Sequence, residues 1–165
     1  MMEPMMVRFR LNGEEVSAPV EPRVHAVDFL REAFELSSPR AGCEHGVCGA
    51  CTLRVDGAVV RGCLMLGVQL HGTVVETLEG LTASGEIADL QQAFHERNAT
   101  QCGFCTAGML MVSQDWLRCA QSCDRGAIRE HLSGNYCRCT GYEAIVDAVE
   151  KVAHARGLQD TGSDA

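Results

Sequence analysis

The chain has 165 residues, of which 46% are hydrophobic, so it can form one ordinary domain or two small ones with a packed core. It carries 14 basic and 22 acidic residues, a formal net charge of −8, which excludes a basic surface for nucleic acid. The sequence has no apolar run long enough to span a bilayer and no secretory pattern near Met1. We therefore expect a cytoplasmic protein without a membrane span.

The chain opens with the pattern of a β-hairpin. Apolar and polar residues alternate over 7–11, which is the period of a strand, and Asn12-Gly13 is a dipeptide that tight hairpin turns favour. A returning strand is expected over 15–20. We expect Pro19 and Pro22 to end it, because proline has no N–H group for a sheet ladder.

The following segments complete a small mixed sheet with one helix. Apolar residues at helical spacing predict a helix over 25–36, packed on the hairpin. Further strands are expected over 52–55, 58–61 and 73–77. Two hairpins and a crossing helix indicate an N-terminal domain of the β-grasp kind over residues 1–80.

After residue 80 the apolar periodicity becomes that of helices. Helices are expected around 87–94, over 106–119, over 127–132 and from Glu143 onward. The run Thr140-Gly-Tyr-Glu143 has the form of a capping box for the last helix. We interpret 81–157 as an all-α four-helix domain and 158–165 as a flexible tail, so the predicted fold class is α+β.

Ten cysteines are far more than a chain of this length ordinarily carries. A disulfide framework would require export and usually a shorter chain. The cysteines are also grouped in tight clusters along the sequence, which favours metal ligation over disulfides.

The first cysteine cluster has the spacing C-x4-C-x2-C, followed by a distant fourth cysteine. Its members are Cys43, Cys48, Cys51 and Cys63. This is the plant-type ferredoxin pattern for a [2Fe-2S] cluster. Glycines between the ligands, Gly42, Gly46 and Gly49, allow the backbone to approach inorganic sulfide and to direct N–H groups at it.

The second cysteine cluster is made of two pairs, each close to the start of a predicted helix. They are Cys102 with Cys105 and Cys137 with Cys139. A helix N-terminus stabilises thiolate, and two helix starts that meet in a bundle would bring four sulfur atoms together. The spacing alone allows either a zinc site or a second iron–sulfur cluster.

Taken in order, both motif sets resemble the iron–sulfur subunit of the molybdenum hydroxylases, a family that includes xanthine dehydrogenase, aldehyde oxidoreductase and aerobic carbon monoxide dehydrogenase. The resemblance extends from Val7 to Arg156 and includes Gln101-Cys-Gly-Phe-Cys-Thr and Gly134-Asn-Tyr-Cys-Arg-Cys-Thr-Gly-Tyr. It implies one [2Fe-2S] cluster on the first four cysteines in a ferredoxin-like domain, and a second on the last four in the helical domain.

The resemblance also implies a function and partners. Gln101 and Cys139 match positions that contact the molybdopterin of a large subunit. Electrons would pass from molybdopterin through the two clusters to FAD in a medium subunit, or to a cytochrome. The overall reaction would hydroxylate an N-heteroaromatic compound or an aldehyde with oxygen from water. This chain has no recognisable nucleophile, acid–base pair or dinucleotide motif, so no catalytic residue is expected in it.

Two alternatives remain open at this point. One is a zinc-stabilised interaction module, and the other is a free-standing two-cluster ferredoxin, although a simple ferredoxin needs only the first domain.

Four residues stand outside the ligand motifs. Ala107 replaces a proline usual in the family. Cys119 and Cys123 are expected as small, partly buried apolar side chains, on one helix face if the helix continues that far, with a redox disulfide or an adventitious metal site as the alternative. His45 is expected as a loop residue beside the first site.

Overall fold

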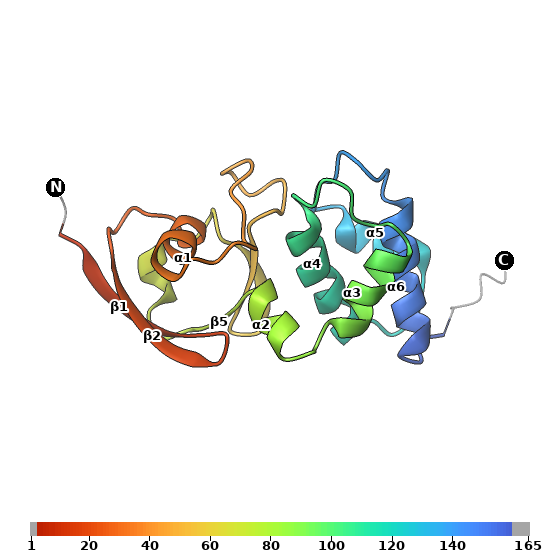
Figure 1. Ribbon diagram of the computed structural model, residues 1–165, viewed down its shortest axis with the longest axis horizontal. Helices are drawn as coiled ribbons and strands as arrows, with labels where there is room; N and C mark the ends of the chain where they lie inside the picture. Colours follow the sequence, from red (N-terminus) through yellow and green to blue (C-terminus); the bar gives the residue numbers. More distant parts are fainter. Residues whose placement is uncertain (1–2, 160–165) are drawn as a thin grey trace.

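A computed structural model describes residues 3–159. Figure 1 shows two parts side by side, a sheet with one crossing helix and a group of helices. The α+β class predicted from the sequence is confirmed. Of the predicted tail, 160–165 lie outside the described residues, and Gln159 accepts a backbone hydrogen bond from Cys123 at 2.9 Å. None of the helices in 3–159 is both long and apolar enough to cross a membrane.

The sheet has five strands in the order β2-β1-β5-β3-β4. The strands are β1 (Met5–Leu11), β2 (Glu14–Val20), β3 (Thr52–Val55), β4 (Ala58–Arg61) and β5 (Val74–Glu76). Strands β1 and β5 pair in parallel, while the remaining neighbours are antiparallel. Helix α1 (Ala26–Phe34) crosses the sheet, and a short 3₁₀ helix, η1 (Gly67–Leu70), precedes β5.

The first hairpin has the predicted turn but a longer second strand. Asn12 and Gly13 have φ values of 51° and 92°, the left-handed conformations that a tight hairpin turn requires. The prediction that Pro19 ends the strand is wrong, because Pro19 pairs with Met6 inside β2. Strand β2 lies at the edge of the sheet, where proline is tolerated.

Aromatic side chains join α1 to the sheet. The ring of Phe9 on β1 meets Phe34 edge-on with centroids 5.5 Å apart, and Phe29 meets Phe34 at the same separation. Edge-to-face pairs of this kind add to the free energy gained from burying the rings. This core fixes α1, after which the chain enters the loop of the first cysteine cluster.

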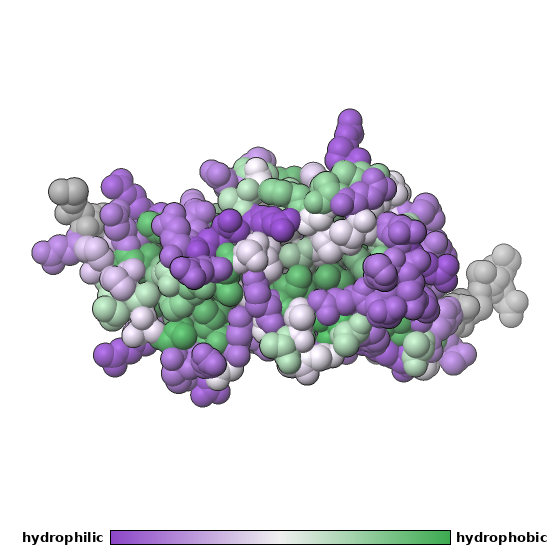
Figure 2. Space-filling view, viewed as in Figure 1, coloured by the Kyte–Doolittle hydropathy of each residue, from purple (hydrophilic) through white to green (hydrophobic). Residues whose placement is uncertain are grey.

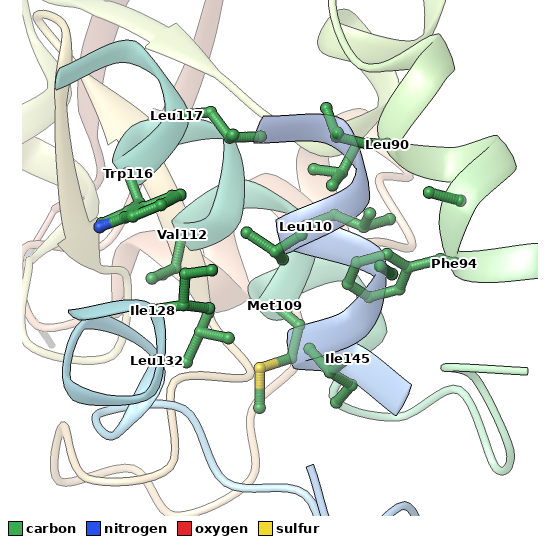
Figure 3. Packing of buried hydrophobic residues seen from close by; sticks show 14 of the residues in the cluster. Leu90, Phe94, Met109, Leu110, Val112, Trp116, Leu117, Ile128, Leu132 and Ile145 are labelled. Carbon is green, nitrogen blue, oxygen red and sulfur yellow. The ribbon is translucent and has the colours of Figure 1, made fainter. Parts of the chain in front are cut away.

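The second part is built around one deeply buried helix. The helices are α2 (Leu78–Ala83), α3 (Ala88–Glu96), α4 (Thr106–Cys119), α5 (Arg125–Leu132) and α6 (Glu143–Ala155). Figure 3 shows Met109 and Leu110 of α4 among side chains from α3, α5 and α6, including Phe94, Ile128 and Ile145. Helix α4 also packs against β3 and β4, so it lies between the sheet and the other helices.

The start of α6 differs from the prediction. No side chain caps the helix, and Tyr142, which precedes it, has a left-handed φ of 68°. The predicted capping box is therefore wrong. Thr140 Oγ1 lies 3.2 Å from Cys137 Sγ and accepts a hydrogen bond from the Tyr142 N–H. The Thr140 hydroxyl therefore contacts the cysteine loop and does not cap the helix.

A buried arginine connects the sheet to the helices. Arg54 of β3 has a side chain that is 6% exposed and donates to Glu76 at 2.7 Å and to Glu86 at 2.8 Å. Gln114 of α4 donates to the same Glu86 oxygen at 3.0 Å. The Arg54 guanidinium lowers the pKa of Glu86 to about 2. The ion pair therefore keeps Glu86 charged and ties α4 to β3.

We predict that Arg54→Met lowers the stability of the whole fold. The substitution leaves two partly buried carboxylates without their cation, and the carboxylates' one-third exposure reduces the cost to about 2 kcal/mol. The thermal unfolding midpoint, followed by circular dichroism, should fall by several degrees. Arg23→Met, which removes an exposed arginine, should leave the midpoint unchanged. An equal midpoint for both variants would contradict this role.

Candidate metal centres

The first cysteine loop lies between α1 and β3 and is shaped by left-handed residues. Gly46 and Gly49 have φ values of 84° and 76°. This curvature directs the Cys48 N–H at Cys43 Sγ, 3.3 Å away. Hydrogen bonds from the N–H groups of Cys48 and His45 lower the pKa of Cys43 to about 6, so this thiol ionises readily.

The other two thiols of the first site lie in the interior. Cys51 and Cys63 are each 1% exposed, and the Gly62 N–H donates to the Cys51 carbonyl at 3.0 Å, which holds the two segments together. Burial raises the pKa of Cys51 to about 11, and the neighbouring Cys63 contributes to the shift. A cation at the site would favour the Cys51 thiolate.

The second site is formed by the turn before α4 and the loop between α5 and α6. Cys105 precedes the first residue of α4, and Gly103 allows the turn with a φ of 78°. Burial raises the pKa of Cys105 to about 12, with Cys137 the next contributor. The Phe104 N–H and the Cys139 thiol lower the pKa of Cys102. Each of the four predicted cysteines therefore interacts with others of the set.

Each site supplies the four cysteines that a [2Fe-2S] cluster needs. At the first site Cys43 interacts with Cys48, and Cys51 interacts with Cys63 and Cys48. At the second site Cys102 interacts with Cys139 and Cys137, and Cys105 interacts with Cys137 and Cys102. Tetrahedral zinc takes the same number of thiolates, about 2.3 Å from one ion. The arrangement of the thiols alone therefore allows either kind of centre.

The two cysteine loops contact each other directly. The N–H of Tyr136 donates to the carbonyl of Cys48 at 2.8 Å. On the other side, Arg40 donates to the Gly103 carbonyl at 2.6 Å and lies 5.6 Å from the centre of the Phe104 ring. These contacts were not predicted from the sequence, because no local motif reports them. They place both sites in one rigid region of the molecule.

Apolar side chains surround the cysteine loops at the surface. Val47, Leu64, Phe104 and Tyr136 are exposed by 41%, 63%, 47% and 55%. Figure 2 shows apolar surface gathered along the upper edge of the molecule, where the loops lie in Figure 1. Gln101 and Cys139 are exposed in the same loops. Exposed apolar groups concentrated in one region are typical of protein interfaces.

The remaining residues singled out in the sequence lie as follows. His45 contacts the Cys43 carbonyl through Nδ1, in agreement with a loop position beside the first site. Ala107 is buried in the first turn of α4. Helix α4 ends at Cys119 as predicted, so Cys119 and Cys123 do not share a helix face, and the expectation that both are partly buried is wrong. Cys119 is exposed and Cys123 is buried in the helical core.

A groove with a volume of about 600 Å³ lies between the two parts. Its carboxylate, Glu79, accepts hydrogen bonds from Thr77 and from the N–H groups of Ser37 and Ser38. Burial opposes ionisation of Glu79, but hydrogen bonds from Ser38 and Thr77 hold its pKa below the usual range. Glu79 is thus a structural anion with no capacity as a base near neutral pH.

Comparisons with known proteins agree with this arrangement. Residues 9–76 match the family model of the 2Fe-2S iron-sulfur cluster binding domain, and residues 77–150 match that of the [2Fe-2S] binding domain. The chain therefore belongs to the class of two-domain [2Fe-2S] proteins. Its relatives define the family more narrowly.

The chain is 44% identical to the caffeine dehydrogenase subunit gamma of Pseudomonas sp. (strain CBB1) over 92% of its own length and 93% of that protein. It is 47% identical to the nicotine 6-hydroxylase small subunit of Paenarthrobacter nicotinovorans, over 84% of each chain. Quinoline 2-oxidoreductase from Pseudomonas putida 86 has a similar structure, with a TM-score of 0.86, 45% identity and coverage of 94% and 98%. The chain belongs to the family of iron–sulfur electron-transfer subunits of the molybdenum hydroxylases.

We predict that Gly108→Ala disturbs the contact between the loops. A methyl group at Gly108 would lie 2.2 Å from the Gly49 carbonyl oxygen, which is backbone and cannot turn aside. Overpacking should cost about 2 kcal/mol, more than the gain of about 1 kcal/mol from helix propensity. The thermal unfolding midpoint should fall. In Gly126→Ala the methyl meets only the Asp124 side chain, so a similar loss there would contradict the explanation.

Proposed function

We propose that Cys43, Cys48, Cys51 and Cys63 hold one [2Fe-2S] cluster, and that Cys102, Cys105, Cys137 and Cys139 hold a second. The observation that carries this proposal is that residues 9–76 and 77–150 each match a [2Fe-2S]-binding family model and each contain four of the eight cysteines. The same matches disfavour the zinc-stabilised module, because both models describe [2Fe-2S] binding. We propose cofactor domains at 1–80 and 81–157, whereas the family models match residues 9–76 and 77–150.

When bound, the two clusters supply one-electron transfer between a molybdopterin centre in a large partner subunit and an acceptor. The chain's own residues determine the setting of that chemistry. Backbone N–H groups face the Cys43 sulfur, and the interior around Cys51 and Cys63 excludes water from one side of the first site. Hydrogen bonds to sulfur and limited solvent access both influence cluster potential.

The exposed side chains around the two sites support a proposal of two docking faces, which are surfaces that bind partner subunits. We propose that Gln101 and Cys139 contact the pterin of the large subunit, because both are exposed beside the apolar side chains of Phe104 and Tyr136. We propose that an FAD-binding medium subunit approaches the first site, where Val47 and Leu64 are exposed. A cytochrome is the second candidate for the acceptor. Both faces would be buried in a complex, which argues against a free-standing ferredoxin.

We propose an N-heteroaromatic compound as substrate of the complex, hydroxylated with oxygen from water. Relatives named for caffeine, nicotine and quinoline support this class. An aldehyde is the alternative, supported by likeness to the aldehyde oxidoreductase from Desulfovibrio desulfuricans, with a TM-score of 0.83 and 34% identity. The likeness occupies 17% of that longer chain. We propose a cytoplasmic location, because the cytosol keeps thiols reduced while a cluster is inserted.

Metal and sulfide analysis of the purified chain tests the proposed function. We expect about four iron atoms and about four acid-labile sulfides per chain, with negligible zinc, because each [2Fe-2S] cluster contains two of each. Cys51→Ser should remove half of the iron, while the matched control Cys119→Ser should remove none. Two zinc ions per chain without sulfide would reject the proposal in favour of the zinc-stabilised module.

A further inference from the structure

A buried amide lies between the two cysteine loops. Asn135, which precedes Cys137 by two residues, is 1% exposed. Its Nδ2 donates to the Gly49 carbonyl at 3.3 Å, and its Oδ1 accepts from Arg61 Nη2 at 2.9 Å. A side chain on Gly49 would lie 2.4 Å from this amide. Asn135 thus fills the space that the glycine leaves open.

The guanidinium of Arg61 reaches both loops from the end of β4. Its Nη2 also donates to the Gly134 carbonyl at 2.9 Å, and its Nη1 donates to Thr52 Oγ1 at 2.5 Å. Thr52 in turn donates to the Gly49 carbonyl at 2.7 Å. Arg61 precedes Cys63 by two residues, and Thr52 follows Cys51 directly. The residues joined by these hydrogen bonds therefore lie close in sequence to proposed cluster ligands of both sites.

We infer that Arg61 and Asn135 are positioning residues that fix the second cysteine loop against the first and so set the separation of the two clusters. This inference rests on the proposed function. Asn135 is buried, so losing either partner would leave an unpaired polar group at a cost of about 1–3 kcal/mol. The network consequently resists any movement that separates Cys137 from Cys48. The neighbouring hydrogen bond, from the Tyr136 N–H to the Cys48 carbonyl, depends on the same alignment of the two loops.

Spacing matters because one-electron exchange between two centres falls steeply with their separation. In that exchange one cluster loses an electron and the other gains it, with no bond made or broken and no proton moved. A loose connection between the loops would widen the range of separations. Arg61 and Asn135 restrict that range without contacting substrate, and they are not catalytic residues. The Arg54 network joins the same two parts through Glu76, Glu86 and Gln114, none of which bonds to Arg61 or Asn135, so general stability and cluster spacing can be tested separately.

The test uses the assembled complex, with both clusters reduced for the magnetic measurement and with one electron between the two clusters for the measurement of exchange. Asn135→Leu keeps the branched shape of the side chain, Arg61→Met keeps its aliphatic stem, and both remove the hydrogen bonds. The readouts are the magnetic interaction between the two reduced clusters, seen as splitting or broadening in electron paramagnetic resonance, and the rate of electron exchange between them. Both variants should reduce the magnetic interaction and slow exchange several-fold. Arg10→Met, which removes an exposed arginine on the hairpin, should change neither.

The double variant makes the test sharper. If Arg61 and Asn135 act as one unit, Arg61→Met combined with Asn135→Leu should be little worse than the more severe single variant. Arg61 is only partly buried, so its variants keep the test valid if Asn135→Leu fails to fold. Unchanged magnetic interaction in Arg61→Met with full iron content would overturn the inference. Absence of iron and sulfide from the wild-type complex would instead reject the proposed function.

Discussion

The close approach of the Gly49 carbonyl to α4 is the contact on which the arrangement of both cysteine sites depends. Gly49 has a left-handed backbone, and Gly108 of α4 has no side chain to obstruct its carbonyl. This approach lets Tyr136 bond to Cys48, and it joins a loop of the sheet to two segments of the helical part. Neither part could move far from the other without breaking these contacts.

Each site combines a protected side and an accessible side. At the first site Cys51 and Cys63 are buried, while Cys43 and Cys48 lie closer to solvent. At the second site Cys105 and Cys137 are half-buried, while Cys102 and Cys139 are exposed. Sulfur atoms at the surface, next to exposed apolar side chains, allow close contact with a partner. The family defined by the relatives consists of subunits that work in larger assemblies.

Patterns within short segments of the sequence predicted most of the fold and the identity of the thiols. Strands β3 and β4 and helix α4 have the predicted bounds because period and turn chemistry are local. Pro19 could not be placed correctly because the sequence does not reveal that β2 is an edge strand. Contacts between residues 74 apart, such as Arg61 with Asn135, have no local pattern at all. The loop-to-loop network is therefore visible only in three dimensions.

The central claim is that one chain holds two different [2Fe-2S] clusters. Electron paramagnetic resonance of the dithionite-reduced complex at cryogenic temperature, with spin quantification, tests it most directly. The account predicts two distinct iron–sulfur signals of equal intensity, because the two sites differ in burial and in hydrogen bonding to sulfur. A single signal in a sample with full iron occupancy, or no iron–sulfur signal in a sample that contains zinc, would contradict it.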